Sequence, residues 1–180
     1  MADGQNSILW ICGIPGSGKS TLSKYISKRL TDEILESPGT ISVSFFFRWT
    51  SDIDRTPTRL LRSLIYQILS QCPADMGDLV SLTLNQRSRS TALSRYRKLS
   101  SPWTSKCLLG IFEESLLRIS KSQRVFFIID ALDECSESEC ADVLSILSFL
   151  HSSKLDNPVK LCLTGRMSVG QAVVPIHEEG

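Results

Sequence analysis

The sequence contains no apolar run near the roughly 18 residues that a membrane-spanning helix needs, and its N-terminus lacks the pattern of a signal peptide. A charge imbalance is also missing, because 20 basic and 19 acidic residues leave a formal net charge of +1. So small a net charge gives no general attraction to nucleic acid or to anionic membranes. We therefore expect a cytoplasmic domain that has no membrane partner and for which nucleic acid is an unlikely partner.

The six cysteines include no Cys-x-x-Cys pair, and no histidine lies close enough to Cys135 and Cys140 to complete a zinc motif. Cys12 and Cys162 fall within apolar segments that predict strands, where a cysteine usually serves as a small buried side chain. We interpret the cysteines as free thiols of a protein in a reducing compartment.

One segment near the N-terminus matches a functional pattern. Gly13-Ile14-Pro15-Gly16-Ser17-Gly18-Lys19-Ser20 fits G-x-x-x-x-G-K-[ST], the phosphate-binding loop. Its glycines permit positive φ angles, so that successive backbone N–H groups can turn toward a phosphate. We expect Lys19 to reach the β- and γ-phosphates of a nucleotide and the hydroxyl of Ser20 to bind Mg²⁺, with Thr21 completing the binding segment.

The residues on either side of this loop fit its function. The apolar run Ile8 to Gly13 predicts a strand that is buried on both faces. After the loop, apolar residues recur at helical spacing, at Leu22, Tyr25, Ile26 and Leu30. A strand followed by the loop and a helix places the positive end of the helix at the anion.

A second acidic segment follows a later strand. Val125 to Asp130 is an apolar strand that ends in an acid, at the sheet edge where ligands of open α/β sheets bind. Asp130 is therefore expected to hold Mg²⁺ directly or through water. Asp133 or Glu134 is expected to orient or deprotonate the attacking water. The alternative is that these acids only lead into the next helix, whose N-terminus favours negative charge.

Arg166 follows a further predicted strand, Val159 to Thr164, and is expected at the same edge of the sheet. An arginine there can sense a γ-phosphate by charge-assisted hydrogen bonds. An ordinary surface arginine is the alternative.

The remaining chain predicts one α/β domain over residues 1–180, with a mainly parallel sheet and helices on both faces. Residues 1–7 are polar and predict a loose lead-in. Further helices are predicted after Thr56-Pro57, after Ser101-Pro102, and after the capping-box pair Ser136 and Glu139. Ile41 to Phe47 predicts another strand. Between Asp78 and Glu113 the chain has six basic residues and no acid, which fits a solvated face, a docking surface for an acidic partner or, least of all, nucleic acid.

Taken in order, four segments resemble the NACHT nucleotide-binding domain of STAND ATPases. They are "ILWICGIPGSGKSTL", "FFFR" followed by "LLRSLIYQIL", "FFIIDALDEC" and "LCLTGRM". The similarity is to fungal NOD-like receptors and nephrocystin-3-like proteins, and it covers about Ile8 to Met167. It implies a P-loop NTPase three-layer sandwich with Walker A at 13–20, Walker B at 125–134 and a sensor strand at 159–166.

The resemblance implies an ATP- or GTP-driven switch that hydrolyses its Mg²⁺-bound nucleotide slowly and alternates between triphosphate and diphosphate forms. In such receptors nucleotide exchange leads to self-association and brings effector domains together in innate immunity. Ala131 and the pair Asp133 and Glu134 match the NACHT form of Walker B. Arg166 matches the sensor arginine, although the family more often has Ser-Arg-Pro where this chain has Gly165-Arg166-Met167. The effector, helical, winged-helix and repeat domains that act in cis are expected outside these 180 residues.

Two other functions fit the motifs, namely a non-hydrolysing nucleotide-binding scaffold and a stand-alone P-loop kinase. A kinase would need an acceptor pocket and a basic lid, which residues 87–98 could imitate. Strand order distinguishes the kinase from the STAND-type switch. The STAND resemblance predicts a central first strand, with Val159 to Thr164 lying between it and the Walker B strand. A kinase-like order would pair the first strand with Val125 to Asp130 directly.

Overall fold

The computed structural model describes residues 6–36, 39–48, 55–72, 104–135 and 140–166. The elements in these ranges are β1 (Ser7–Cys12), α1 (Lys19–Glu36), β2 (Thr40–Phe46), α2 (Pro57–Gln71), α4 (Ser105–Ile119), β3 (Arg124–Asp130), the 3-10 helix η2 (Leu132–Glu134), α5 (Cys140–Ser152) and β4 (Val159–Gly165). Strands and helices alternate as the sequence predicts. The basic stretch 87–106, apart from its last residues, and the pair Ser136 and Glu139 lie outside the described residues.

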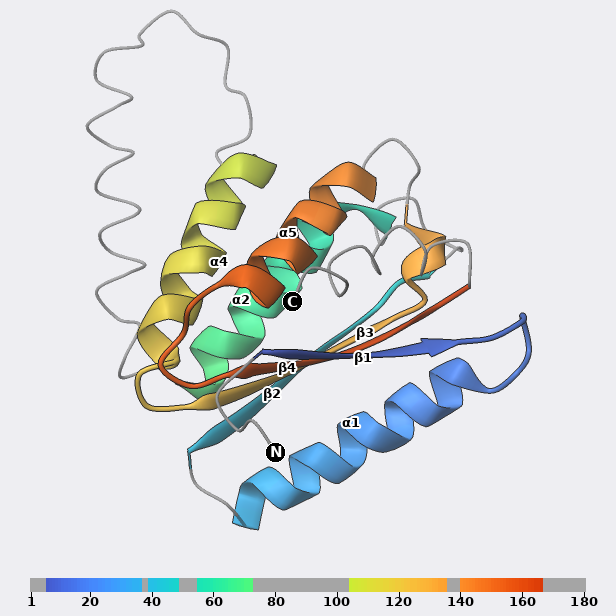
Figure 1. Cartoon of the computed structure of the whole chain (residues 1–180), viewed down its shortest axis with the longest axis horizontal. Coiled ribbons are helices and arrows are strands. Elements are labelled where there is room, and N and C mark those ends of the chain that lie inside the picture. The colour runs from blue at the N-terminus through green and yellow to red at the C-terminus, as the bar shows by residue number, and fades with distance from the viewer. Residues whose placement is uncertain (1–5, 37–38, 49–54, 73–103, 136–139, 167–180) are drawn as a thin grey trace, which may run out of the picture.

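All strand pairs of the described sheet are parallel, and the strand order is β1-β4-β3-β2. The predicted position of β4 between β1 and the Walker B strand β3 is therefore confirmed. The predicted central position of β1 is wrong for this sheet, where β1 forms an edge. Figure 1 shows α1 on one face of the sheet and α2, α4 and α5 on the other, so the predicted three layers are also confirmed.

The main core lies between the sheet and the layer of α2, α4 and α5. Phe112 of α4 packs edge-on against Phe127 of β3, with 5.9 Å between the ring centroids. Other fully buried side chains of this layer are Leu60, Leu61, Leu64, Ile68, Leu108, Leu116, Ile119 and Ile129. Removing the larger part of one such side chain typically costs about 2–5 kcal/mol, so this layer fixes the position of β3 and its acidic end.

The opposite face of the sheet is less completely covered. Helix α1 packs against β2, β3 and β4. Leu9 of β1 consequently stays 57% exposed, and Cys12 is exposed too. The predictions of a doubly buried β1 and of a buried Cys12 are therefore wrong, whereas Cys162 is buried as predicted. Helix α1 also leaves Leu22 and Tyr25 exposed.

Asn6 fixes the start of β1 to two distant parts of the chain. Its Nδ2 donates to the carbonyl oxygens of Leu150 (3.0 Å), His151 (3.0 Å) and Ser153 (2.8 Å). Its Oδ1 accepts from the backbone N–H of Val159 at 2.9 Å. One side chain therefore joins β1, the end of α5 and the start of β4, so the prediction of a loose lead-in is wrong at this residue.

Two glutamines of α2 bond the outer edge of β2. Gln67 accepts from the N–H of Ser44 at 2.9 Å and donates to its carbonyl at 2.8 Å. Gln71 does the same at Ser42, with distances of 3.4 Å and 3.0 Å. The spacing of the two glutamines along α2 matches that of the two serines along β2, because four helical residues rise about 6 Å and two strand residues about 6.6 Å. The two amides therefore satisfy backbone groups of β2 that would otherwise remain open at the edge.

Local N-cap bonds fix where helices α2 and α4 begin. Thr56 accepts from the N–H of Arg59 at 3.2 Å and Pro57 opens α2, as predicted. Helix α4 begins at Ser105, where Thr104 is the N-cap and accepts from the N–H of Cys107 at 3.4 Å. The predicted cap at Ser101 lies outside the described residues. Among the helices that the structure describes, none combines the length and apolarity that crossing a membrane would require.

Candidate functional site

The predicted phosphate-binding loop connects β1 to α1. Gly16 and Gly18 have φ angles of 78° and 87°, which residues with a Cβ rarely adopt. A turn bond from the N–H of Ser17 to the carbonyl of Ile14 at 3.2 Å closes the loop. The first backbone N–H groups of α1 have no partners within the helix, so the loop presents a helix N-terminus of the kind that favours anions.

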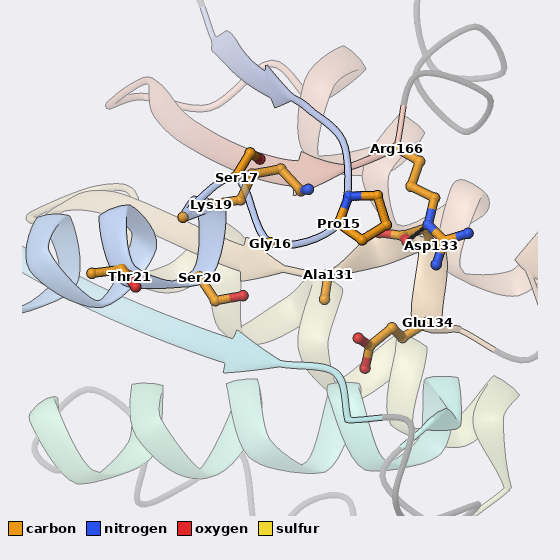
Figure 2. Close-up of a pocket in the computed structure, with 11 residues that line it drawn as sticks. Pro15, Gly16, Ser17, Lys19, Ser20, Thr21, Ala131, Asp133, Glu134 and Arg166 are labelled. Carbon is orange, nitrogen blue, oxygen red and sulfur yellow. Dashed lines mark ion pairs between the residues drawn. The ribbon is translucent and has the colours of Figure 1, made fainter.

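A cavity of about 350 Å³ opens at the carboxyl end of the sheet. It is lined by Pro15, Gly16, Ser17, Gly18, Lys19, Ser20, Thr21, Ala131, Asp133, Glu134 and Arg166. Figure 2 shows that the labelled residues come from the loop and the start of α1, from the segment after β3 and from the end of β4. The structure thus brings together three segments that the sequence analysis selected separately. Gly13, Ile14 and Asp130 lie outside the lining.

Lys19 points into its own loop. Its Nζ donates to the carbonyl oxygens of Gly13 at 2.7 Å and Ile14 at 2.9 Å. Both acceptors belong to the loop, so the ammonium group stays at the cavity wall. Its predicted contact with the β- and γ-phosphates stays a prediction.

Asp130 is only 2% exposed, so its carboxylate lies inside the protein beside the cavity. Two buried hydroxyl groups donate to its Oδ1, that of Ser23 at 2.8 Å and that of Thr164 at 2.6 Å. The hydroxyl of Thr164 also accepts the N–H of Ala131 at 3.0 Å. Ser23 and Thr164 were not among the predicted site residues. Ser23 follows Ser20 by one helical turn, and this spacing was the one signal that could have indicated it.

The two acids after β3 have different surroundings. Ala131 adopts a left-handed conformation with φ 57° and turns the chain into η2, which carries Asp133 and Glu134. Asp133 forms an ion pair with Arg166. The carbonyl of Glu134 accepts from Nε of Arg55 at 2.8 Å, a contact that the sequence pattern did not predict. Figure 2 shows the Glu134 carboxylate on the side of the cavity where Ser20 lies.

Gly165 stands where the resemblance to STAND ATPases leads us to expect a serine. A Cβ at this position would lie 3.3 Å from the ring of Trp10 and 3.4 Å from Oδ1 of Asp133. Such contacts are tight enough that one neighbour would have to move. Glycine therefore allows Trp10 and Asp133 to approach β4 directly before Arg166.

The donor groups at the cavity suit Mg²⁺, a hard cation that prefers a few protein oxygens together with water and phosphate oxygens. Ser20 offers a hydroxyl at the wall and Asp130 a carboxylate beside it. No group of three or more His, Cys, Asp and Glu side chains in the described ranges could hold a metal ion. The residues thus fit a metal that is shared with a phosphate ligand.

Cys162 lies on β4, two residues before Thr164. Burial is the main cause that raises the pKa of its thiol above the ordinary 9.0, and the negative charge of Asp130 raises it further. The thiol therefore stays protonated beside the buried carboxylate at neutral pH.

The family model described as nephrocystin 3, N-terminal, matches residues 1–166. The chain belongs to this family. The match confirms the predicted resemblance to nephrocystin-3-like proteins and to NACHT/STAND-like P-loop domains. No curated protein sequence matches the chain closely enough to count as a relative.

A solved structure resembles this nephrocystin-3 N-terminal domain: the Aeropyrum pernix ORC1 protein, in a complex with DNA. The TM-score is 0.53 at 13% sequence identity, over 97% of this chain and 38% of that chain. At this identity the similarity shows the fold, and it confirms the predicted P-loop NTPase architecture. The chain spans less than half the length of that protein.

Proposed function

We propose that the domain binds a nucleoside triphosphate with Mg²⁺ and hydrolyses it slowly, as the switch of a longer NOD-like receptor. One observation carries the proposal: the phosphate-binding loop, the acids after β3 and Arg166 line the same cavity. The membership of the nephrocystin-3 N-terminal family agrees with it. Fungal origin, a role in innate immunity, and self-association with effector and repeat domains in cis belong to the same proposal.

In this proposal the loop N–H groups and Lys19 hold the phosphates, while Ser20 and Asp130 hold the metal. When bound, the metal would neutralise charge on the β- and γ-phosphates. Glu134 would position the attacking water, and Arg166 would respond to the γ-phosphate from the rim of the cavity. Either ATP or GTP fits these roles, since none of these residues is assigned to the base.

Strand order supports the switch over the kinase. Strand β1 pairs with β4 and β4 with β3, as the STAND resemblance predicts, whereas a kinase-like order would pair β1 with β3. A scaffold that does not hydrolyse its nucleotide would share the same binding contacts. Turnover measured with and without candidate phosphate acceptors separates the three functions.

The binding step is tested with Lys19→Ala, because Lys19 is the one side chain of the loop that brings a full positive charge to the phosphates. Calorimetric titration with Mg²⁺·ATP and Mg²⁺·GTP should show loss of most of the affinity. Lys24→Ala is the matched control, because Lys24 is an exposed lysine of the same helix and does not line the cavity. Unchanged affinity in Lys19→Ala would contradict the proposed site.

A further inference from the structure

Three elements converge on one oxygen atom beside the cavity. Asp130 ends β3, Ser23 lies in the second turn of α1, and Thr164 lies near the end of β4. Ser23 and Thr164 are both 0% exposed, and both donate to Oδ1 of Asp130. The structure gives Oδ2 no hydrogen bond within the described residues.

The direction of the Thr164 bond is fixed by its surroundings. Its oxygen accepts the N–H of Ala131 at 3.0 Å, and its single proton goes to Asp130 at 2.6 Å. Bonds of this kind to a carboxylate are short and about twice as strong as bonds between neutral groups. A carboxylate held by this bond has little freedom to rotate, because rotation would break it inside the protein.

Ser23 has two acceptors for one proton. Its hydroxyl lies 2.8 Å from Oδ1 of Asp130 and 3.1 Å from the carbonyl oxygen of Lys19, one turn back in α1. The shorter bond to the charged group is the stronger one. Ser23 therefore ties the carboxylate to the helix that carries Lys19 and Ser20.

We infer that Ser23 and Thr164 are positioning residues that hold Asp130 with one oxygen fixed and the other available for the metal. This inference rests on the proposed function, because it concerns the metal of the same site. According to this inference, the two hydroxyls fix the relative positions of three elements: the phosphate-binding helix, the acidic strand and the sensor strand. Thr164 precedes Arg166 by only two residues, so a shift of Asp130 would also move the end of β4 that carries Arg166.

A purely structural role predicts a different result. Two buried hydroxyls that only satisfy a buried carboxylate would affect folding and lower the affinity for nucleotide equally with and without metal. Positioning of a metal ligand affects the metal-dependent part of binding alone. Residues that orient metal ligands typically contribute about 10–100-fold to metal affinity.

The experiment uses the full chain and the variants Thr164→Val, Thr164→Ser and Ser23→Ala. Thr164→Val keeps the shape of the side chain and removes the hydroxyl, whereas Thr164→Ser keeps the hydroxyl. Ser115→Ala is the matched control, because Ser115 is a buried helical serine in α4 that donates to the carbonyl of Ile111 at 2.7 Å. Fluorescent ATP or GTP, whichever the unmodified chain prefers, is titrated with EDTA and then with Mg²⁺. Free Mn²⁺ is counted by electron paramagnetic resonance with the nucleotide bound.

Thr164→Val and Ser23→Ala should weaken Mg²⁺ and Mn²⁺ binding by about 10-fold or more and leave the affinity in EDTA within about twofold. Thr164→Ser and Ser115→Ala should behave like the unmodified chain. Equal losses with and without metal, or no loss, overturn the inference. If Thr164→Val does not fold by circular dichroism, Ser23→Ala decides alone. If the unmodified chain binds no nucleotide at all, the proposed function itself fails, which is a separate result.

Discussion

Arg166 and Asp133 form an ion pair at the rim of the cavity, with 2.8 Å between Nε and Oδ2. The arginine side chain is 61% exposed and the aspartate side chain 13%. Ion pairs with an exposed partner contribute little to stability. The pair can therefore open at small cost, and we propose that Asp133 holds Arg166 until a phosphate competes for it.

This pairing separates the roles of the two neighbouring acids. We predict that Glu134→Gln leaves nucleotide affinity nearly intact and slows hydrolysis by about 10²–10⁴-fold, the usual contribution of a group that positions or deprotonates water. Single-turnover kinetics measure the effect. Glu114→Gln, on the far helix α4, is the control and should hydrolyse at the original rate. Rapid hydrolysis that survives both Glu134→Gln and Asp133→Asn would refute the assignment.

Asp133→Asn should change how strongly the domain prefers a nucleoside triphosphate over the diphosphate. Removing the charge frees Arg166 for the γ-phosphate, so the affinity for triphosphate relative to diphosphate should rise, by up to about fivefold if the pair contributes up to about 1 kcal/mol. Adding Arg166→Ala to this variant should abolish the gain. Competition titrations with both nucleotides give the ratio. A gain that persists without Arg166 would show that repulsion by Asp133, and not release of the arginine, is the cause.

Cys162 makes stability depend on pH in the alkaline range. The folded state keeps the thiol protonated above its ordinary pKa of 9.0, so around that pH the unfolded state binds fewer protons. The contribution is therefore complete below pH 9.0 and is lost as pH rises through the raised folded pKa, with a slope of at most about 1.4 kcal/mol per pH unit. Urea unfolding from about pH 8 to about pH 10.5, with reductant and EDTA, should show a steeper loss for the unmodified chain than for Cys162→Ala. Parallel curves would contradict the prediction.

Asn6→Ala should lower the free energy of unfolding by about 2–3 kcal/mol, because it leaves the last carbonyls of α5 and the N–H of Val159 without their partner. Asn6→Asp keeps the acceptor for Val159 but loses the donors and brings negative charge to a helix C-terminus. It should therefore be no more stable than the alanine variant. Denaturant unfolding measures both. A loss below about 0.5 kcal/mol would mean that water replaces these bonds.

The residues of the site were predicted from the sequence more accurately than the burial of the strands. Glu134 and Arg166 share one cavity because the carboxyl ends of parallel strands meet at one edge, which follows from motif order alone. Leu9 was predicted to be buried because it belongs to an apolar run. Its burial depends instead on which strands α1 covers, and an apolar run does not contain this information. Thr164 carried no pattern of its own, and Ser23 only its spacing of one helical turn from Ser20. Their contact with Asp130 exists only once β3 pairs with β4 and α1 packs across both.

The amides of Gln67 and Gln71 have a consequence for how copies of the protein can meet. They occupy the backbone groups of Ser44 and Ser42, so the β2 edge offers little template for another chain to add as a strand. The addition of a strand at this edge would first require both glutamines to break their hydrogen bonds to β2. The nucleotide-driven assembly that we propose would then use side-chain surfaces, whose contacts can separate when the nucleotide changes, and not an extended sheet that would dissociate slowly.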